Sequence, residues 1–251
     1  MPVEPQEIED PTPAKKSFGR YFLRDLETLW AELLKLAAVV EDSLSRSIRA
    51  LCEGRTEGLD EVKRSKGALD RWEIEIERDC VRILAIHQPV ASDLRRVAAV
   101  LKINSDLARL GDLSRHIAKR VKKLSRDQRA FPIPQDLEDL ALDALSMVHD
   151  CLDALTQTDM TKAQAVIDAD ASIDRQYRTV RKQLEREIVQ LPDRVATWLR
   201  LVNSARNLER IADHAVKIAE AALYVKEGII PAPRRAGANA KTVPAASTDA
   251  R

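Results

Sequence analysis

Glycine and aromatic residues are both scarce in this sequence. Its 251 residues include 7 glycines, and only 4% are aromatic, whereas an average chain contains roughly 7% glycine. Because β-sheet proteins need glycine in their turns and favour aromatic residues in their strands, this composition argues against a sheet and favours helices. The hydrophobic fraction of 45% is sufficient for a packed core and argues against wholesale disorder.

The sequence also lacks a cysteine framework, an excess of one charge and a long apolar run. Cys52, Cys80 and Cys151 show no CxxC spacing, which suits reduced thiols that fill the core. With 41 basic and 40 acidic residues, the net charge of +1 gives no electrostatic reason to expect a nucleic-acid partner. The best apolar run, Leu36 to Val40, is far shorter than the ~20 residues of a membrane span, and the acidic N-terminus is not a signal peptide. We therefore expect a soluble cytoplasmic protein that meets a membrane only through partners.

Proline is nearly absent from the middle of the sequence. Of 11 prolines, four lie within residues 2–13 and three after residue 230, which leaves Pro89, Pro132, Pro134 and Pro192. Proline breaks a helix interior but is tolerated in a first turn, so long helices are expected between these positions. Apolar residues at three- and four-residue steps predict six helices, over about 26–54, 56–87, 89–129, 134–155, 166–192 and 193–228.

The two halves of the sequence resemble each other. Residues 106–112 match 207–213 at an offset of 101, residues 69–71 match 173–175 at 104, and residues 40–44 match 148–152 at 108. The offset changes only across expected loops, as in a duplicated three-helix unit. The sequence therefore predicts an all-α protein of two tandem antiparallel three-helix bundles. Repeat 1 spans 20–130 and repeat 2 spans 131–228, with disordered tails at 1–19 and 229–251.

Repeat 2 contains two pairs of acidic residues at a spacing of four. Asp170 and Asp174 are in its second helix, and Glu209 and Asp213 are in its third. This spacing places both carboxylates of a pair on one helix face, where like charges destabilise by roughly 0.2–0.5 kcal/mol unless a cation lies between them. Four carboxylates from two antiparallel helices would suit a hard cation or iron. The alternative is that these acids are solvated and paired with neighbouring arginines.

Histidines near these positions are weaker candidates. His149 occupies the place in repeat 2 that Glu41 occupies in repeat 1, and it is either an outer ligand or a surface or packing residue. His116 is four residues after Asp112, with which it would form a nitrogen–oxygen ligand pair, and the alternative is a structural role. His214 follows Asp213 but points about 100° away on a helix, so we do not expect it to bind the same ion.

A basic stretch ends the third expected helix and is opposed only by Asp127. Cations are favoured at a helix C-terminus, which is a sufficient structural explanation. A surface for an acidic partner or for anionic lipid is the alternative. The basic residues are Arg115, Lys119, Arg120, Lys122, Lys123, Arg126 and Arg129.

Three segments resemble a known family. The sequence QPVASDLR at 88–95 resembles the QPxAxDLR signature of the PhoU family, whose members are accessory and regulatory proteins of phosphate transport. The sequence ERIAD at 209–213 is similar to that family's ERIGD segment, and ERDCVRI at 77–83 is similar to the family upstream of the first signature. The resemblance covers about 20–228. It implies two three-helix bundles, each with a metal-binding surface built from a pair of E(D)xxxD motifs.

The two repeats differ in these motifs. Repeat 2 keeps all four acids, whereas repeat 1 has Lys66 and Ala108 in place of two of them, so that only Asp70 and Asp112 are left. Lys66 would add a cation where a metal would lie. We therefore expect the better metal site at Asp170, Asp174, Glu209 and Asp213, with Asp70 and Asp112 as a degenerate site. The ion is Fe, Zn, Mn or Mg, among which oxygen ligands discriminate poorly.

The resemblance also implies a function. PhoU-like proteins are regulators rather than enzymes: they lower uptake by the phosphate ABC transporter and restrain the phosphate-starvation (Pho regulon) two-component response. The implied partners are the transporter's ATPase subunit, the phosphate-sensing histidine kinase and a second copy of the chain. Two alternatives are a carboxylate-bridged metalloenzyme and a metal-free helical scaffold. The ferritin-like version of the first needs Glu-x-x-His motifs, which none of the four histidines completes.

Overall fold

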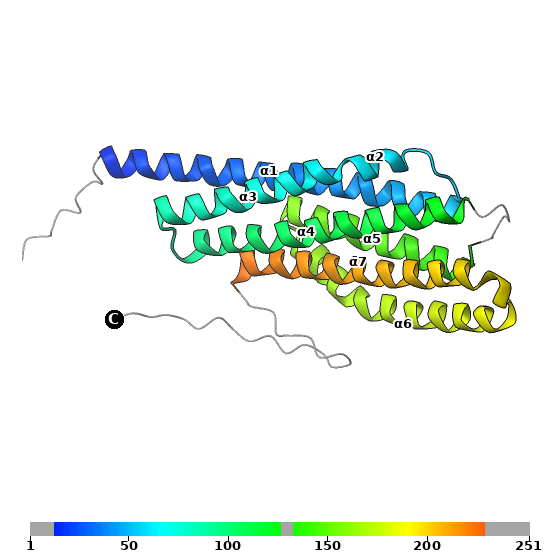
Figure 1. The fold of residues 1–251 in the computed structure, drawn as a ribbon. Coiled ribbons are helices and arrows are strands. Elements are labelled where there is room, and N and C mark those ends of the chain that lie inside the picture. The colour runs from blue at the N-terminus through cyan, green and yellow to red at the C-terminus, as the bar shows by residue number, and fades with distance from the viewer. Residues whose placement is uncertain (1–12, 127–132, 229–251) are drawn as a thin grey trace, which may run out of the picture.

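The structure is a computed structural model that describes residues 13–126 and 133–228. Over these residues the chain is helical and contains no strand (Figure 1), which confirms the predicted all-α class. The helices are α1 (Pro13–Glu53), α2 (Leu59–Arg64), α3 (Lys66–His87), α4 (Ala91–Leu124), α5 (Gln135–Gln157), α6 (Met160–Gln190) and α7 (Val195–Glu227), with a 3₁₀ turn, η1 (Pro192–Arg194). In the described ranges no helix has the length and apolar character needed to cross a membrane.

The helices form two three-helix bundles that share one core. Helices α1, α3 and α4 pack together in repeat 1, and α5, α6 and α7 pack together in repeat 2. The bundles lie side by side because α4 packs on α7 and α1 packs on α5, so equivalent helices of the two repeats meet (Figure 1). One continuous cluster of buried apolar side chains runs from Leu26 to Ala222. The tandem bundles are thus confirmed, and they are closely packed.

The helix boundaries differ from the sequence prediction at several points, one of which is the start of α6 at Met160 rather than at 166. The helix expected over 56–87 is divided at Ser65 into α2 and α3, and Gly58 precedes α2 in a left-handed conformation, with φ 77°. The sixth predicted helix is preceded by η1, so α7 begins at Val195. Helix α1 begins at Pro13, inside the segment 1–19 expected to be a tail, as proline is tolerated in a first turn. The rest of that tail, 1–12, and the tail 229–251 lie outside the described residues.

The signature segment 88–95 forms the turn between α3 and α4. Gln88 and Ala91 both have φ of 46°, a conformation that costs energy for residues other than glycine. Pro89 lies between them, and the amide of Asp93 donates a hydrogen bond to the carbonyl of Val90. Asp93 then lies in the first turn of α4, where the positive end of the helix dipole favours an acidic side chain. The signature therefore encodes a tight reversal that aligns α3 against α4.

Two histidine–carboxylate hydrogen bonds connect the repeats. His149 Nδ1 of α5 lies 2.7 Å from Glu41 Oε1 of α1, and His214 Nδ1 of α7 lies 2.8 Å from Asp106 Oδ1 of α4. Each pair is separated by 108 residues along the chain. His149, whose side chain is 61% exposed, therefore lies at the surface where the repeats meet and bonds to Glu41, whereas His214 is directed to α4 rather than to Asp213.

The cysteines are core residues, as their sequence positions suggested. Cys80 and Cys151 are fully buried and Cys52 is partly buried, all three as free thiols. Burial raises the pKa of Cys52 to about 11 and that of Cys80 to about 12, so both stay protonated and unreactive at neutral pH.

Candidate functional site

The four acids predicted in repeat 2 lie on two helices that pack against each other. Asp170 and Asp174 are on α6, and Glu209 and Asp213 are on α7. The negative charge of Asp174 acts on both Glu209 and Asp213, so these three acids share one region of the α6–α7 surface. Asp170 is one helical turn before Asp174. This group is called the repeat 2 acid face below.

The electrostatics of the repeat 2 acid face are unfavourable without a cation. Burial raises the pKa of Glu209, and repulsion from Asp213 and Asp174 raises it further. Desolvation likewise raises the pKa of Asp213, with a further contribution from Asp174. The positive charges of Arg206 and Arg210 partly oppose the rise at Glu209, and that of Lys217 opposes the rise at Asp213. Within the described part of the chain, however, neither acid forms an ion pair. A bound cation would remove the repulsion between the carboxylates and would offset the free-energy cost of burying their charges.

The side chains do not converge on one point, however. Asp174 accepts a hydrogen bond from Arg178 Nη2 at 3.3 Å, on an exposed part of α6. Across residues 13–126 and 133–228, no three side chains of Asp, Glu, His or Cys lie together as a metal-binding group. The donor chemistry of Asp174, Glu209 and Asp213 thus fits a hard cation, and the metal site itself stays a prediction.

In repeat 1 the corresponding surface is occupied by basic side chains. Lys66 Nζ lies 3.1 Å from Asp70 Oδ2, and Arg115 forms an ion pair with Asp112. Both acids border a hollow of about 310 Å³ between α3 and α4, as do Lys66, Arg109 and Arg115. Here each predicted acid has a basic partner, in contrast to Glu209 and Asp213 in repeat 2.

Sequence reasoning missed one acid in the repeat 1 hollow. Glu73 borders it three residues after Asp70, hence on the same helix face. Burial raises the pKa of Glu73, Arg109 opposes that rise, and the negative charges of Asp70 and Asp112 add to it. The three-residue spacing was the available signal. The offset of 104 maps Glu73 onto Tyr177 in repeat 2, so this acid is not part of the repeated motif.

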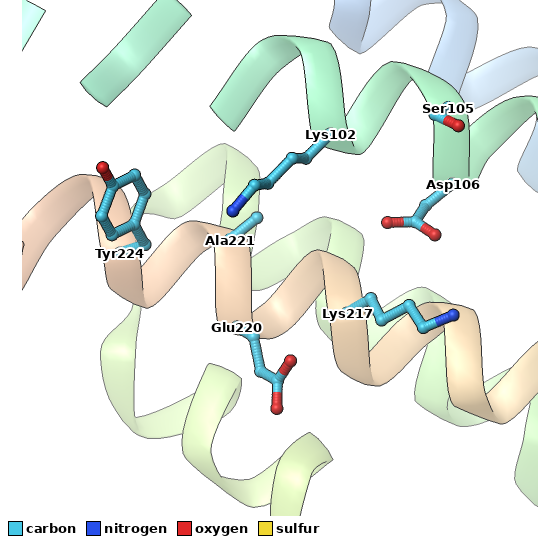
Figure 2. A pocket seen from close by; sticks show the side chains of 7 residues that line it. All are labelled: Lys102, Ser105, Asp106, Lys217, Glu220, Ala221 and Tyr224. Carbon is cyan, nitrogen blue, oxygen red and sulfur yellow. The ribbon is translucent and has the colours of Figure 1, made fainter. Parts of the chain in front are cut away.

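A further hollow, of about 410 Å³, lies between the repeats on the α4–α7 contact (Figure 2). Asp106, which lines the hollow, accepts the hydrogen bond from His214, and Lys102 Nζ lies 5.4 Å from the centre of the Tyr224 ring. The lining contains two basic and two acidic side chains, so its charge is balanced. The lining residues are Lys102, Ser105, Asp106, Lys217, Glu220, Ala221 and Tyr224.

Comparison with known proteins finds the same fold in proteins of one family. The PhoU domain model matches the chain twice, over residues 33–121 and 137–222. The chain is 32% identical over 210 residues to the phosphate-specific transport system accessory protein PhoU homolog of Pseudomonas putida, covering 84% of this chain and 82% of that protein. It is 33% identical over 207 residues to the homolog from Aquifex aeolicus, covering 82% of this chain and 93% of that protein.

Two crystal structures resemble this one. PhoU from Pseudomonas aeruginosa superposes with a TM-score of 0.79 at 30% identity, covering 82% of this chain and 99% of that chain. The phosphate transport system regulatory protein PhoU from Streptococcus pneumoniae gives a TM-score of 0.73 at 29% identity, covering 83% of this chain and 98% of that chain. The two domain matches fall on the two bundles, one in each repeat. This chain therefore belongs to the PhoU family.

Proposed function

We propose that this chain is a non-enzymatic regulator of phosphate homeostasis. It lowers uptake by the phosphate ABC transporter and keeps the phosphate-starvation response off when phosphate is plentiful. The double PhoU-domain match along both bundles carries this proposal. The names of the relatives support it, because those of P. putida and A. aeolicus are accessory proteins of phosphate-specific transport.

The regulator acts through protein–protein contacts with the transporter's ATPase subunit and with the phosphate-sensing histidine kinase. Such contacts need exposed surface with apolar anchors. Both bundles supply them at equivalent turns: Val90 and Leu94 are exposed at the α3–α4 turn, and Val189, Leu191 and Val195 are exposed at the α6–α7 turn. The protein acts in the cytoplasm as a homodimer and reaches the membrane only through these partners.

The repeat 2 acid face holds a metal ion, which is Fe, Zn, Mn or Mg. Asp174, Glu209 and Asp213 supply its oxygen ligands, with Asp170 as the fourth acid. The unpaired, repelling carboxylates of Glu209 and Asp213 support this assignment. Repeat 1 does not hold metal in the same way, since Lys66 and Arg115 already neutralise its acids.

Deletion of the gene tests the regulatory role. Cells without the protein are expected to take up more phosphate and to show higher alkaline phosphatase activity in phosphate-rich medium, and a plasmid copy should reverse both changes. Unchanged uptake and phosphatase activity in the deletion strain would contradict the proposal.

Elemental analysis of purified protein tests the metal assignment separately. The double variant E209A/D213A is expected to lose bound metal, whereas D112A should keep nearly all of it. Equal loss in the two variants would refute the difference between repeats.

The same measurement separates the alternatives. Wild-type protein that contains no metal, and gains none when metal is added, would favour a metal-free scaffold without affecting the regulatory proposal. A redox-active diiron centre with oxidase activity would instead favour a metalloenzyme, although no histidine here follows a glutamate by three residues.

A further inference from the structure

The contact between α4 and α7 has two halves that are related by the sequence repeat but differ in polarity. The helices are antiparallel there: Gly228 lies next to Arg95, and His214 bonds to Asp106. The first half contains the hollow of Figure 2, lined by Lys102 and Lys217. At the offset of 101, the equivalents of Lys102 and Lys217 in the second half are Asn203 and His116.

The second half presents two side chains on the facing sides of the helices. Asn207 is seven residues before His214, and residues seven apart lie on the same helix face to within about 20°. Since His214 contacts α4, Asn207 also faces α4. Arg120 is fourteen residues after Asp106, which contacts α7, so Arg120 lies on the face of α4 that meets α7.

Both side chains carry a buried donor that lacks an acceptor among the described residues. These donors are Asn207 Nδ2 and Arg120 Nη1, and only 5% of Asn207 is exposed. The repeat explains the orphaned amide. In the first half Asp106 faces His214, whereas their equivalents in the second half are Asn207 and Leu113, and leucine offers no acceptor. An unsatisfied buried donor costs about 1–3 kcal/mol, so an acceptor from outside the chain would be favoured here.

The surroundings of these donors are basic. Burial lowers the pKa of His116, and the positive charges of Arg120 and Arg115 from α4 and of Arg210 from α7 lower it further. Asp112 opposes them, but it is already paired with Arg115. Long side chains lean toward the N-terminus of their helix, which brings the Arg120 guanidinium back toward the level of His116, on which it acts. Leu113, the residue of α4 that is equivalent to His214 and faces Asn207, lies about one turn before His116.

We propose that this second half of the α4–α7 contact binds an oxyanion of the phosphate class, held by Arg120 Nη1 and Asn207 Nδ2 in the field of Arg210. A phosphate oxygen satisfies both orphaned donors and offsets the clustered positive charge, and a guanidinium matches phosphate geometry. The source is either inorganic phosphate or the headgroup of an anionic lipid. The proposal depends neither on the metal site nor on the regulatory role.

The test titrates full-length protein with sodium phosphate in a chloride buffer of constant ionic strength, and follows binding by calorimetry and by thermal stability. Hydrogen bonds to charged groups contribute about 1.5–3 kcal/mol, so R120Q and N207L are each expected to weaken phosphate binding about tenfold or more. The matched control K217Q removes one charge from the first half of the contact and should change the affinity less than about twofold. Melting curves followed by circular dichroism establish that each variant is folded; N207L removes a donor that has no acceptor, so it should not unfold the protein.

Flotation with vesicles identifies the source of the anion. If the wild type binds free phosphate and R120Q and N207L weaken that binding, the ligand is inorganic phosphate. If the wild type binds phosphatidic acid vesicles but neither phosphatidylcholine vesicles nor free phosphate, and both variants lose this binding, the ligand is a lipid headgroup. Absence of both kinds of binding, or equal weakening by K217Q, would overturn the proposal.

Discussion

The repeat 2 acid face leads to a prediction with opposite signs in the absence and presence of metal. The isosteric double variant E209Q/D213N removes both charges and keeps the side-chain volumes. In EDTA it should be more stable than the wild type. Burial raises the pKa values of Glu209 and Asp213, with repulsion from Asp213 and Asp174 adding to the rise at Glu209 and repulsion from Asp174 adding to the rise at Asp213, so the ionised forms disfavour the folded state.

The size of the effect follows from the geometry. The i,i+4 repulsion contributes roughly 0.2–0.5 kcal/mol, and the exposure of Asp213 keeps the desolvation contribution small through solvent screening. A total of about 0.5 kcal/mol raises Tm by about 1–2 °C in a protein of this size. With metal at 100 times its Kd, the wild type should instead gain about 2.7 kcal/mol, or about 5–10 °C, and the variant should gain nothing.

Differential scanning fluorimetry in EDTA and in excess metal measures both effects. The advantage of the variant in EDTA is complete above the raised pKa values. It disappears as the pH falls below the ordinary values of 4.5 for Glu209 and 3.8 for Asp213, because both wild-type acids are then neutral. A variant that is less stable than the wild type in EDTA, or that metal stabilises as much as the wild type, would contradict this prediction.

Three further predictions concern the fold. Hydrogen bonding to Glu41 raises the pKa of His149 above 6.5, so the stabilisation that H149Q removes is full below pH 6.5 and is lost as the pH rises through the raised pKa. Because the pair is exposed, we expect H149Q to cost less than about 1 kcal/mol at low pH. Urea unfolding at pH 5.5 and pH 8.5 measures this cost, and an equal loss of stability at both pH values would contradict the prediction. Asp159 caps α6 by accepting two backbone hydrogen bonds, and D159A should cost about 0.5–2 kcal/mol; an unchanged urea midpoint would argue against the cap. Ile103 in α4 is fully buried, so I103A should lower the free energy of unfolding by about 2–5 kcal/mol. The control V189A alters a side chain that is 80% exposed and should change the free energy of unfolding by no more than about 0.5 kcal/mol. Similar losses in the two variants would contradict the packing.

Much of the fold could be predicted because the signals are local. Apolar periodicity gave the helices, and Pro89 and Pro192 marked the equivalent turns of the two repeats. The break at Ser65 was not predictable in the same way, because its backbone is nearly helical, at φ −63° and ψ −20°, and nothing in the apolar pattern stops there.

The candidate site was predictable only within each helix. Spacing placed Glu209 and Asp213 on one helix face, and Lys66, which stands where the repeat 2 motif has an acid, is bonded to Asp70. Contacts between repeats carry no local signal. The bond between Asp106 and His214 spans 108 residues and depends on how α4 packs on α7, which the pattern of either helix alone does not reveal.

Under the proposed metal assignment, the two repeats have diverged, so that one presents acids to a cation and the other has neutralised its own. An anomalous-scattering map of crystals grown without added metal locates any bound ion in both repeats. We expect a peak between α6 and α7, beside Asp174, Glu209 and Asp213, and none between Asp70 and Asp112. A peak in repeat 1 alone, or peaks of equal height in both repeats, would contradict the assignment.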